Sequence, residues 1–390
     1  MKNIIPYGKQ KIFNSDLLEV KKALKSNLIT TGIYVTKFEN LFCKYTKAKY
    51  STSCTSGTAA IHLALESLGV KKNDNIIIPS VNFIAAANLS SKLGANIYLA
   101  DVDKNSGQMT PEDLINCIKF NKLKKIKVFF SMYNGGSPNH AKEFYKIKKK
   151  YKTIHIEDAC HALGAKYLNT KNSKVGSCKF SDMATFSFHP LKSITTGEGG
   201  MITTSDKFLY EKIKKLKNHG IIRKKSNNKN YNWSYEVLEP GYNYRLSDIN
   251  CALGFSQLKK IDSIILKRKL IAKYYNKKLK NFSYFLQTPE MLNNQTSAWH
   301  LYIINIDFNK LKIKKKTFIN ELYKKKIITQ VHYIPTFLQP AFKKLKTPNL
   351  KGAIKYYESS ISLPIFYDLN WKKLDYIVNS IEYLLNKYKK

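Results

Sequence analysis

The stretch Thr185-Phe186-Ser187-Phe188-His189-Pro190-Leu191-Lys192, followed by Thr195-Thr196-Gly197-Glu198-Gly199-Gly200, decides the fold of this chain. It places one lysine between a short apolar run and a glycine-rich turn. The flanking residues 183–187 and 200–204 are typical of two short strands, which would hold the lysine rigidly against a sheet. A lysine in such a dry setting loses its charge readily, becomes nucleophilic and can form a Schiff base with an aldehyde cofactor.

Most lysines of this chain are expected to be ordinary surface residues. The 67 basic residues include only three arginines, Arg223, Arg245 and Arg268, so the other 64 are lysines. A lysine chosen at random therefore lies in solvent. Lys192 differs because its neighbours are apolar, small or hydroxylic rather than charged. We interpret it as a catalytic candidate that needs independent support from the rest of the chain.

The composition narrows the class of protein. A length of 390 residues, 43% of them hydrophobic, is enough for two domains with sizeable cores. The net charge of +40 suggests a nucleic acid or an anionic membrane as partner. The lysines are spread along the whole chain, however, and arginine, which is favoured for base readout, is scarce. We expect neither of these partners, and we interpret the lysines as solvated side chains whose field attracts anionic ligands.

The six cysteines, Cys43, Cys54, Cys117, Cys160, Cys178 and Cys251, contain no C-x-x-C pair. Neither a zinc ribbon nor a redox motif is therefore predicted, and free thiols in a reducing cytoplasm are the simplest interpretation. The first ten residues lack the apolar run of a secretory signal, and no stretch approaches membrane-spanning length. We expect a cytoplasmic protein.

Alternating elements predict an α/β fold. Short apolar strands are expected at 76–78, 96–100, 126–130, 154–157, 183–187 and 201–204, with helices at 16–25, 58–69, 84–93 and 140–151. Strands of this kind, separated by helices, form a mostly parallel central sheet with helices on both faces.

The pattern changes after residue 245. Helices are expected at 246–258, 261–279, 314–326 and 371–388, with a single strand at 299–308. We predict a large domain with an N-terminal arm over residues 1–245, and a smaller C-terminal α+β domain over residues 246–390 that completes the substrate site.

Two further sites support a ligand beside Lys192. Ser56-Gly57-Thr58 stands directly before a helix, where backbone N–H groups and a hydroxyl can hold a phosphate, although the same residues also make an ordinary cap. Asp158 ends the strand 154–157, and ligands of open α/β sheets lie at the carboxyl ends of strands. A carboxylate there can keep a pyridine nitrogen protonated, which makes the ring an electron sink.

A metal site is the alternative for this segment, because His155, Glu157, Asp158 and His161 are typical ligand types. Alternation along a strand opposes it, since His155 and Glu157 share one face while Asp158 points to the other. The deaminase pattern, H-x-E with a later C-x-x-C, is also incomplete. We expect no metal.

Phe83 and Arg245 are weaker candidates. Phe83 follows the strand at 76–78, where an aromatic ring could stack on a flat cofactor or simply fill the core. Arg245 is one of three arginines in a lysine-biased chain, and its planar fork suits a site in which geometry matters.

Taken together, these residues resemble the DegT/DnrJ/EryC1/StrS nucleotide-sugar aminotransferases. The resemblance rests on an ordered set of motifs: Gly57-Thr58, Phe83, Glu157-Asp158-x-x-His161, Ser187-Phe188-x-x-x-Lys192, Gly197-Glu198-Gly199-Gly200 and Gly241-Tyr242-Asn243-Tyr244-Arg245. It spans nearly the whole chain, from Pro6-Tyr7 to Ile361-Ser362-Leu363-Pro364. It implies the aspartate-aminotransferase fold, which is fold type I of the pyridoxal phosphate enzymes.

The resemblance also implies a role for each motif residue. Lys192 would be the Schiff-base lysine, and pyridoxal 5′-phosphate the cofactor. Asp158 would pair with the pyridine nitrogen, His161 would approach the ring hydroxyl, and Phe83 would stack on the ring. Gly57, Thr58 and Ser187 would hold the phosphate. Asn243 would reach the phosphate in the neighbouring subunit, which implies a homodimer with shared active sites.

Within the family, Lys217-Asn218-His219-Gly220 and Gln330-Val331-His332-Tyr333-Ile334-Pro335 are most similar to the aminotransferases of pseudaminic acid biosynthesis. The implied reaction moves an amino group from L-glutamate, which leaves as 2-oxoglutarate, to C4 of a UDP-linked 4-keto-6-deoxy-N-acetylhexosamine. Tyr7, Thr30, Arg245 and His332 are the implied substrate-binding residues. The alternatives are a perosamine, bacillosamine or C3-amino sugar aminotransferase and, from another class, a basic nucleic-acid-binding protein.

Overall fold

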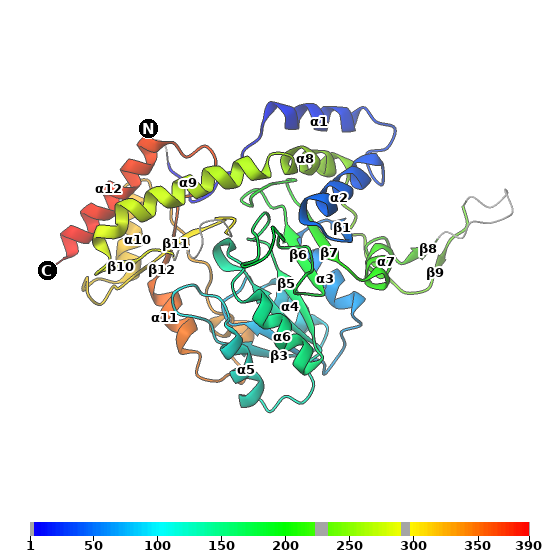
Figure 1. Cartoon of the computed structure of the whole chain (residues 1–390), viewed down its shortest axis with the longest axis horizontal. Helices are drawn as coiled ribbons and strands as arrows, with labels where there is room; N and C mark the ends of the chain where they lie inside the picture. Colours follow the sequence, from blue (N-terminus) through cyan, green and yellow to red (C-terminus); the bar gives the residue numbers. More distant parts are fainter. Residues whose placement is uncertain (1–3, 223–232, 290–296, 390) are drawn as a thin grey trace.

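The computed structural model describes residues 4–222, 233–289 and 297–389. Its main body is a seven-stranded sheet in the order β1-β7-β6-β5-β4-β2-β3 (Figure 1). Every neighbouring pair is parallel except the two pairs that β7 makes with β1 and β6. The predicted mostly parallel sheet is therefore confirmed. The strands are β1 (Tyr50–Cys54), β2 (Asn75–Pro79), β3 (Asn96–Ala100), β4 (Val128–Met132), β5 (Ile154–Asp158), β6 (Met183–Ser187) and β7 (Gly200–Thr204).

Helices cover both faces of this sheet. Successive strand residues belong to different hydrophobic clusters: Met183 and Ile202 pack on one side, and Ala184 and Met201 on the other. On the first side α3 contacts α4 and α7, and on the second α2 contacts α8. The helices of this part are α1 (Asn14–Leu24), α2 (Ile33–Thr46), α3 (Gly57–Ser67), α4 (Ala85–Lys92), α5 (Pro111–Phe120), α6 (Ala141–Tyr151), α7 (Lys207–Leu216) and α8 (Asp248–Leu258).

Several strands differ from the predicted bounds, and β1 and β4 differ for identifiable reasons. The polar strand β1 was not predicted, because its buried hydroxyls carry no apolar signal. Two of them donate to Glu39 of α2, whose carbonyl accepts from Ser51 Oγ and whose carboxylate accepts from Ser53 Oγ. Strand β4 begins two residues later than predicted, because Ile126 is buried beside the strand rather than in it.

A smaller three-stranded antiparallel sheet, β10-β11-β12, follows in the C-terminal part. The strand predicted at 299–308 is shorter than expected, because the backbone of Trp299 has a positive φ of 49° just before β11. The elements are α9 (Ile261–Leu279), β10 (Leu286–Gln287), β11 (Tyr302–Ile306), α10 (Lys315–Lys324), α11 (Lys351–Ser359), β12 (Ser360–Leu363) and α12 (Trp371–Tyr388).

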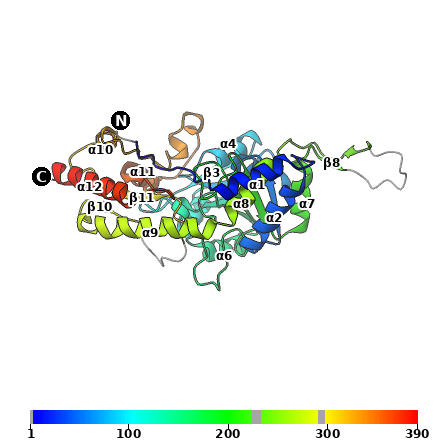
Figure 2. The ribbon, with the colours of Figure 1, turned by 90° about the horizontal axis from the view of Figure 1, so that it is seen from above.

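The long helix α9 joins the two parts, as Figures 1 and 2 show. Its first turns contribute Ile261 and Ile264 to a core shared with the large sheet, and its last turns contribute Tyr275 and Leu279 to the core of the small sheet. A short hairpin, β8 (Ile221–Ile222) and β9 (Glu236–Val237), projects beyond α7 (Figure 1). The predicted division at residues 245 and 246 stays a prediction. Within the described ranges, no helix is long and apolar enough to span a bilayer.

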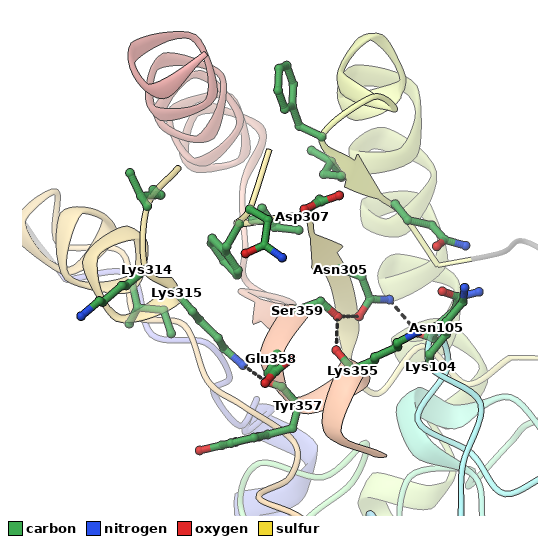
Figure 3. A pocket seen from close by; sticks show the side chains of 18 of the residues that line it. Lys104, Asn105, Asn305, Asp307, Lys314, Lys315, Lys355, Tyr357, Glu358 and Ser359 are labelled. Atoms are coloured by element: carbon green, nitrogen blue, oxygen red, sulfur yellow. Dashed lines mark hydrogen bonds between the residues drawn. The ribbon is translucent and has the colours of Figure 1, made fainter. Parts of the chain in front are cut away.

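A cavity of about 1110 Å³ lies at one end of the small sheet (Figure 3). Its walls come from the segments 283–287, 305–309, 313–316 and 355–359, together with Lys104 and Asn105. Lysine supplies 5 of the 22 lining residues, against 64 of the 390 residues in the chain, and in so lysine-rich a chain this modest excess marks no binding site. None of the residues predicted for catalysis or cofactor binding lines this cavity.

Candidate active site

The predicted residues gather at the carboxyl edge of the large sheet. Asp158 is the last residue of β5, and it is buried next to Thr185 of β6 in the ladder. Ser187 ends β6, and the loop that follows carries Lys192. Since β1 is parallel to β6, its carboxyl end brings Ser56 to the same edge. This edge is where ligands of open α/β sheets bind.

Backbone hydrogen bonds fold the lysine loop back on the sheet. Phe188 N–H donates to the Gly199 carbonyl at 2.8 Å, and Thr196 N–H donates to the Phe188 carbonyl at 3.0 Å. Phe188 itself is fully buried against Phe38 and Phe42 of α2. The apolar run before Lys192 therefore anchors the loop, as the sequence predicts for a rigidly held lysine.

The Lys192 amine is desolvated and faces acidic groups. Burial lowers its pKa, while Cys160 and Asp158 act in the opposite direction. Burial also raises the pKa of the Asp158 carboxyl, and a hydrogen bond from the Cys160 N–H together with the nearby Lys192 opposes that rise. A larger neutral fraction makes a lysine a nucleophile and a base, so the local electrostatics suit the predicted role.

The start of α3 forms a compact cradle. Ser56 caps the helix by accepting from the Ala59 N–H at 3.0 Å, which leaves the N–H groups of Gly57 and Thr58 without a partner in the described chain. A Cβ atom at Gly57 would lie 2.7 Å from the Ser187 Cβ, and one at Gly200 would lie 2.2 Å from the Ser56 carbonyl oxygen. The free N–H groups of Gly57 and Thr58, the hydroxyls of Thr58 and Ser187, and this close packing suit a phosphate site.

Phe83 is largely exposed, and its ring centroid lies 5.9 Å from that of Tyr333. The side-chain amide of the adjacent Asn82 is buried with no partner for its oxygen or its nitrogen among the described atoms. His161 Nδ1 is buried and unpartnered in the same way. Orphaned polar atoms next to an exposed aromatic ring fit a flat, polar cofactor.

Three imidazoles lie together beside the lysine. The ring of His161 lies 4.3 Å from that of His300 and 6.3 Å from that of His332. Burial lowers the pKa of His161 and His300 well below the usual range, and it lowers that of His332 to about 3, so all three rings are neutral at pH 7. Tyr7 packs against His332 with ring centroids 5.6 Å apart.

Sequence reasoning assigned no role to His300 or Tyr333. His300 comes from the segment before β11, and its backbone carbonyl accepts from the buried Arg268 of α9 at 3.0 Å. Tyr333 donates to or accepts from His161 Nε2 at 3.0 Å. His300 lies in none of the motifs, whereas Tyr333 lies in the motif Gln330-Val331-His332-Tyr333-Ile334-Pro335, of which only His332 was given a role.

The opposite face of β5 holds His155 and Glu157, two of the four groups considered for a metal. Tyr133 and Tyr167 donate to the Glu157 carboxylate at 2.6 and 2.7 Å, and His155 Nε2 lies 2.8 Å from Ser131 Oγ. The Glu157 carboxylate and His155 Nε2 are thus hydrogen-bonded within the protein, on the face of β5 opposite Asp158. Among the described residues, no three His, Cys, Asp or Glu side chains are arranged to hold a metal ion.

Three predicted residues have hydrogen-bond or bridge partners outside the Lys192 site. Isolated antiparallel β-bridges of the backbone join Thr30 to Ser247 and Asn243 to Asn218. The Arg245 side chain donates to Asn218 Oδ1 at 2.5 Å. Both Thr30 and Asn243 are exposed. No contact in the described structure joins these three side chains to Lys192, Asp158 or His161.

Comparison with known proteins agrees with the geometry. The model of the DegT/DnrJ/EryC1/StrS aminotransferase family matches residues 10–382. A Campylobacter jejuni protein named UDP-4-amino-4,6-dideoxy-N-acetyl-beta-L-altrosamine transaminase is 36% identical over 388 residues, which is 99% of each chain. Helicobacter pylori PseC, described as an aminotransferase involved in the biosynthesis of pseudoaminic acid, superimposes with a TM-score of 0.89 at 30% identity, covering 99% of this chain and 100% of that one.

A putative sugar aminotransferase from Streptococcus pneumoniae has a TM-score of 0.90 in its PMP-form, at 26% identity over 98% of this chain and 100% of that one. The same protein also has a solved PLP-form. The predicted fold, family and cofactor are confirmed. This chain therefore belongs to the DegT/DnrJ/EryC1/StrS aminotransferase family and is a pyridoxal-phosphate-dependent aminotransferase.

Proposed function

We propose that this enzyme transfers the amino group of L-glutamate to C4 of a UDP-linked 4-keto-6-deoxy-N-acetylhexosamine, as in pseudaminic acid biosynthesis. The observation that carries the reaction class is the desolvated Lys192 beside Asp158 at the carboxyl edge of the sheet. The substrate rests on the names of the full-length relatives at 36% and 30% identity. The basic surface attracts a substrate that carries a diphosphate.

The residues fit the cofactor in the following way. Gly57, Thr58 and Ser187 would hold its phosphate, and Asp158 its pyridine nitrogen. Phe83 and His161 would contact the ring. When bound, pyridoxal phosphate supplies an electron-accepting ring that stabilises negative charge on a substrate carbon.

Lys192 would both bond the cofactor and move protons. Burial favours the neutral amine, which is the form that attacks a carbonyl group and accepts a proton from the α-carbon of glutamate. The Asp158 carboxylate would keep a positive charge at the ring nitrogen. Tyr7 and His332, which pack together on the small-domain side, would contact the sugar.

We also propose a homodimer with shared sites. No hydrogen bond among the described residues joins Thr30, Asn243 or Arg245 to the Lys192 site, and a second subunit would bring them to a lysine. The surface of α1 and the loop after it offers apolar side chains for such an interface. Leu17, Leu18, Leu24 and Leu28 are each more than half exposed.

Subunit mixing tests the shared site. Lys192→Ala and Asn243→Ala homodimers should both have low activity, and mixing them should restore it. Each hybrid dimer would contain one site with both native residues. A mixture no more active than its parts, with subunit exchange verified, would contradict the shared site.

The substrate is tested with L-glutamate and a panel of UDP-, GDP- and dTDP-linked keto-sugars. We expect amination of the UDP-4-keto-6-deoxy-N-acetylhexosamine with the highest kcat/KM, and an amino group at C4 by NMR of the product. Preference for a GDP- or dTDP-sugar, or amination at C3, would refute the proposed substrate.

A further inference from the structure

Tyr333 joins the two side chains that are expected to face the cofactor ring. Its hydroxyl lies 3.0 Å from His161 Nε2, and the two rings are inclined by 29° with their centroids 6.0 Å apart. On its other side, the Tyr333 ring contacts Phe83. Tyr333 comes from the segment before the 3-10 turn Thr336–Leu338, 172 residues further along the chain than His161. This contact therefore exists only because the small domain packs on the large one.

His161 has one nitrogen with a partner and one without. Nε2 meets the Tyr333 hydroxyl, whereas Nδ1 is buried with no hydrogen-bond partner in the described chain. Burial and the nearby Lys192 lower the pKa of His161, so the ring is neutral and carries a single proton. The chemistry that His161 can offer depends on which nitrogen holds that proton.

Two arrangements are possible. If Tyr333 donates to Nε2, the proton resides on Nδ1, and only this N–H lacks a partner. If Nε2 donates to the Tyr333 oxygen, the described structure leaves both the tyrosine hydrogen and the Nδ1 lone pair unmatched. Burial and Asp158 raise the pKa of Tyr333, so its hydroxyl keeps its hydrogen. Buried polar atoms without partners are costly, which favours the first arrangement.

Neither neighbouring imidazole, His300 or His332, is positioned to select the His161 tautomer. The His300 ring lies close to His161, but its own Nδ1 is also buried without a partner. The Nδ1 of His332 is occupied by Ser362 Oγ at 2.8 Å. Within the described residues, Tyr333 is therefore the group positioned to select the His161 tautomer.

We propose that Tyr333 is a positioning residue that sets the tautomer of His161, so that its Nδ1–H is presented as a hydrogen-bond donor inside the site. The acceptor would be an oxygen on the pyridoxal phosphate ring, and this part alone rests on the proposed function. A hydrogen bond to one nitrogen of a histidine commonly decides what the other nitrogen can do.

The tautomer can be measured without cofactor. In ligand-free protein labelled with 15N-histidine, NMR distinguishes protonated from bare ring nitrogens, and His161→Gln identifies the His161 signals. We expect the proton on Nδ1 in the native protein and a shift towards Nε2 in Tyr333→Phe, which retains the ring. Tyr7→Phe removes a neighbouring hydroxyl that does not contact His161 and should change nothing. A native proton on Nε2, or an unchanged tautomer in Tyr333→Phe, would overturn the proposal.

A double-mutant cycle on cofactor affinity gives a second readout. Tyr333→Phe should weaken pyridoxal phosphate binding about 10-fold, the size expected for one buried hydrogen bond. In a His161→Gln background the same substitution should have almost no effect, because no tautomer remains to be set. Equal losses in both backgrounds would mean that Tyr333 acts independently of His161. A native protein that binds no cofactor would refute the proposed function, while the NMR result would still decide the tautomer.

Discussion

Lys192 and Lys315 are two desolvated lysines in very different surroundings. Burial lowers the pKa of both amines, that of Lys315 to about 8. Lys192 lies at the carboxyl edge of the large sheet, among Asp158, Cys160 and neutral imidazoles. Lys315 lies in the wide cavity of the small domain, where it donates to the Tyr357 carbonyl near Glu358 (Figure 3). A lowered pKa is thus not sufficient for catalysis, because the amine also needs groups that bind a cofactor around it.

Glu157 and Asp158 differ in the same way although they are neighbours on one strand, β5. It adjoins Asp158 on β5 but points to the opposite face, where two tyrosine hydroxyls hold it. Burial raises the pKa of its carboxyl to about 7. The pKa shifts of Glu157 and Lys315 are both caused by burial, and no catalytic residue takes part in either.

Replacing Lys192 should have the largest effect on turnover, and replacing Lys315 almost none. Lys192→Ala should lower kcat by at least about 10,000-fold, because the nucleophile and the base are lost together. Lys315→Ala should leave kcat within about twofold of the native value, since no site residue touches it. Turnover with glutamate and borohydride trapping of the cofactor measure both. Substantial turnover by Lys192→Ala would refute the assignment of the catalytic lysine.

Replacing a carboxylate should likewise lower kcat strongly at the active site and only slightly in the small-domain cavity. Asp158→Asn should reduce kcat by about 100- to 1000-fold, as expected when a preorganised charge is removed from an active site. Asp307→Asn, in the wall of the small-domain cavity, is the matched control and should have little effect. Equal losses from the two substitutions would show that the cavity participates in the reaction.

Glu157→Gln should change stability rather than turnover. The folded carboxyl keeps its proton up to about pH 7, whereas the unfolded one loses it near 4.5. The unfolded state therefore releases its proton first, and the native protein loses about 3 kcal/mol of stability as the pH rises from below 4.5 to above 7. Glutamine removes this loss and retains an acceptor for the tyrosines.

The check for Glu157 is denaturant unfolding at several pH values. The native protein should be destabilised relative to Glu157→Gln above pH 7, with the pH-dependent part of the difference vanishing below pH 4.5. The exposed Glu143→Gln substitution, on α6, should show no such dependence. A constant difference at all pH values would mean that the Glu157 carboxyl titrates normally.

The smallest expected effect separates two glycines. An alanine Cβ at Gly57 would press against the Ser187 side chain, so Gly57→Ala should weaken cofactor binding about 10-fold. Gly69→Ala meets no atom within 4 Å, and it should cost stability through its φ of +62° without changing cofactor affinity. Fluorescence titration with pyridoxal phosphate gives both affinities. A normal affinity in Gly57→Ala would remove Gly57 from the phosphate cradle.

Elements with a strong local pattern were predictable from the sequence. The apolar strands β3 and β6 and the helices α9 and α12 have the predicted bounds. Strand β1 was missed, because its residues 51–53 are hydroxylic, and its two buried serines donate to Glu39 of the preceding helix α2. Burial of polar side chains is satisfied by tertiary partners and leaves no periodic signal.

The sequence by itself determined which residues lie at the carboxyl edge. Asp158 ends one predicted strand and Lys192 follows another, and parallel strands bring their carboxyl ends to one side of a sheet. The Gly57-Thr58 pair was predicted only as the start of a helix, because β1 was missed. Only the tertiary structure decided that His300 and Tyr333 join them, and that Asn243 and Arg245 contact Asn218 instead. The physical reason is that local patterns encode the position of a residue within its own element, whereas contacts between distant segments arise only when the elements pack.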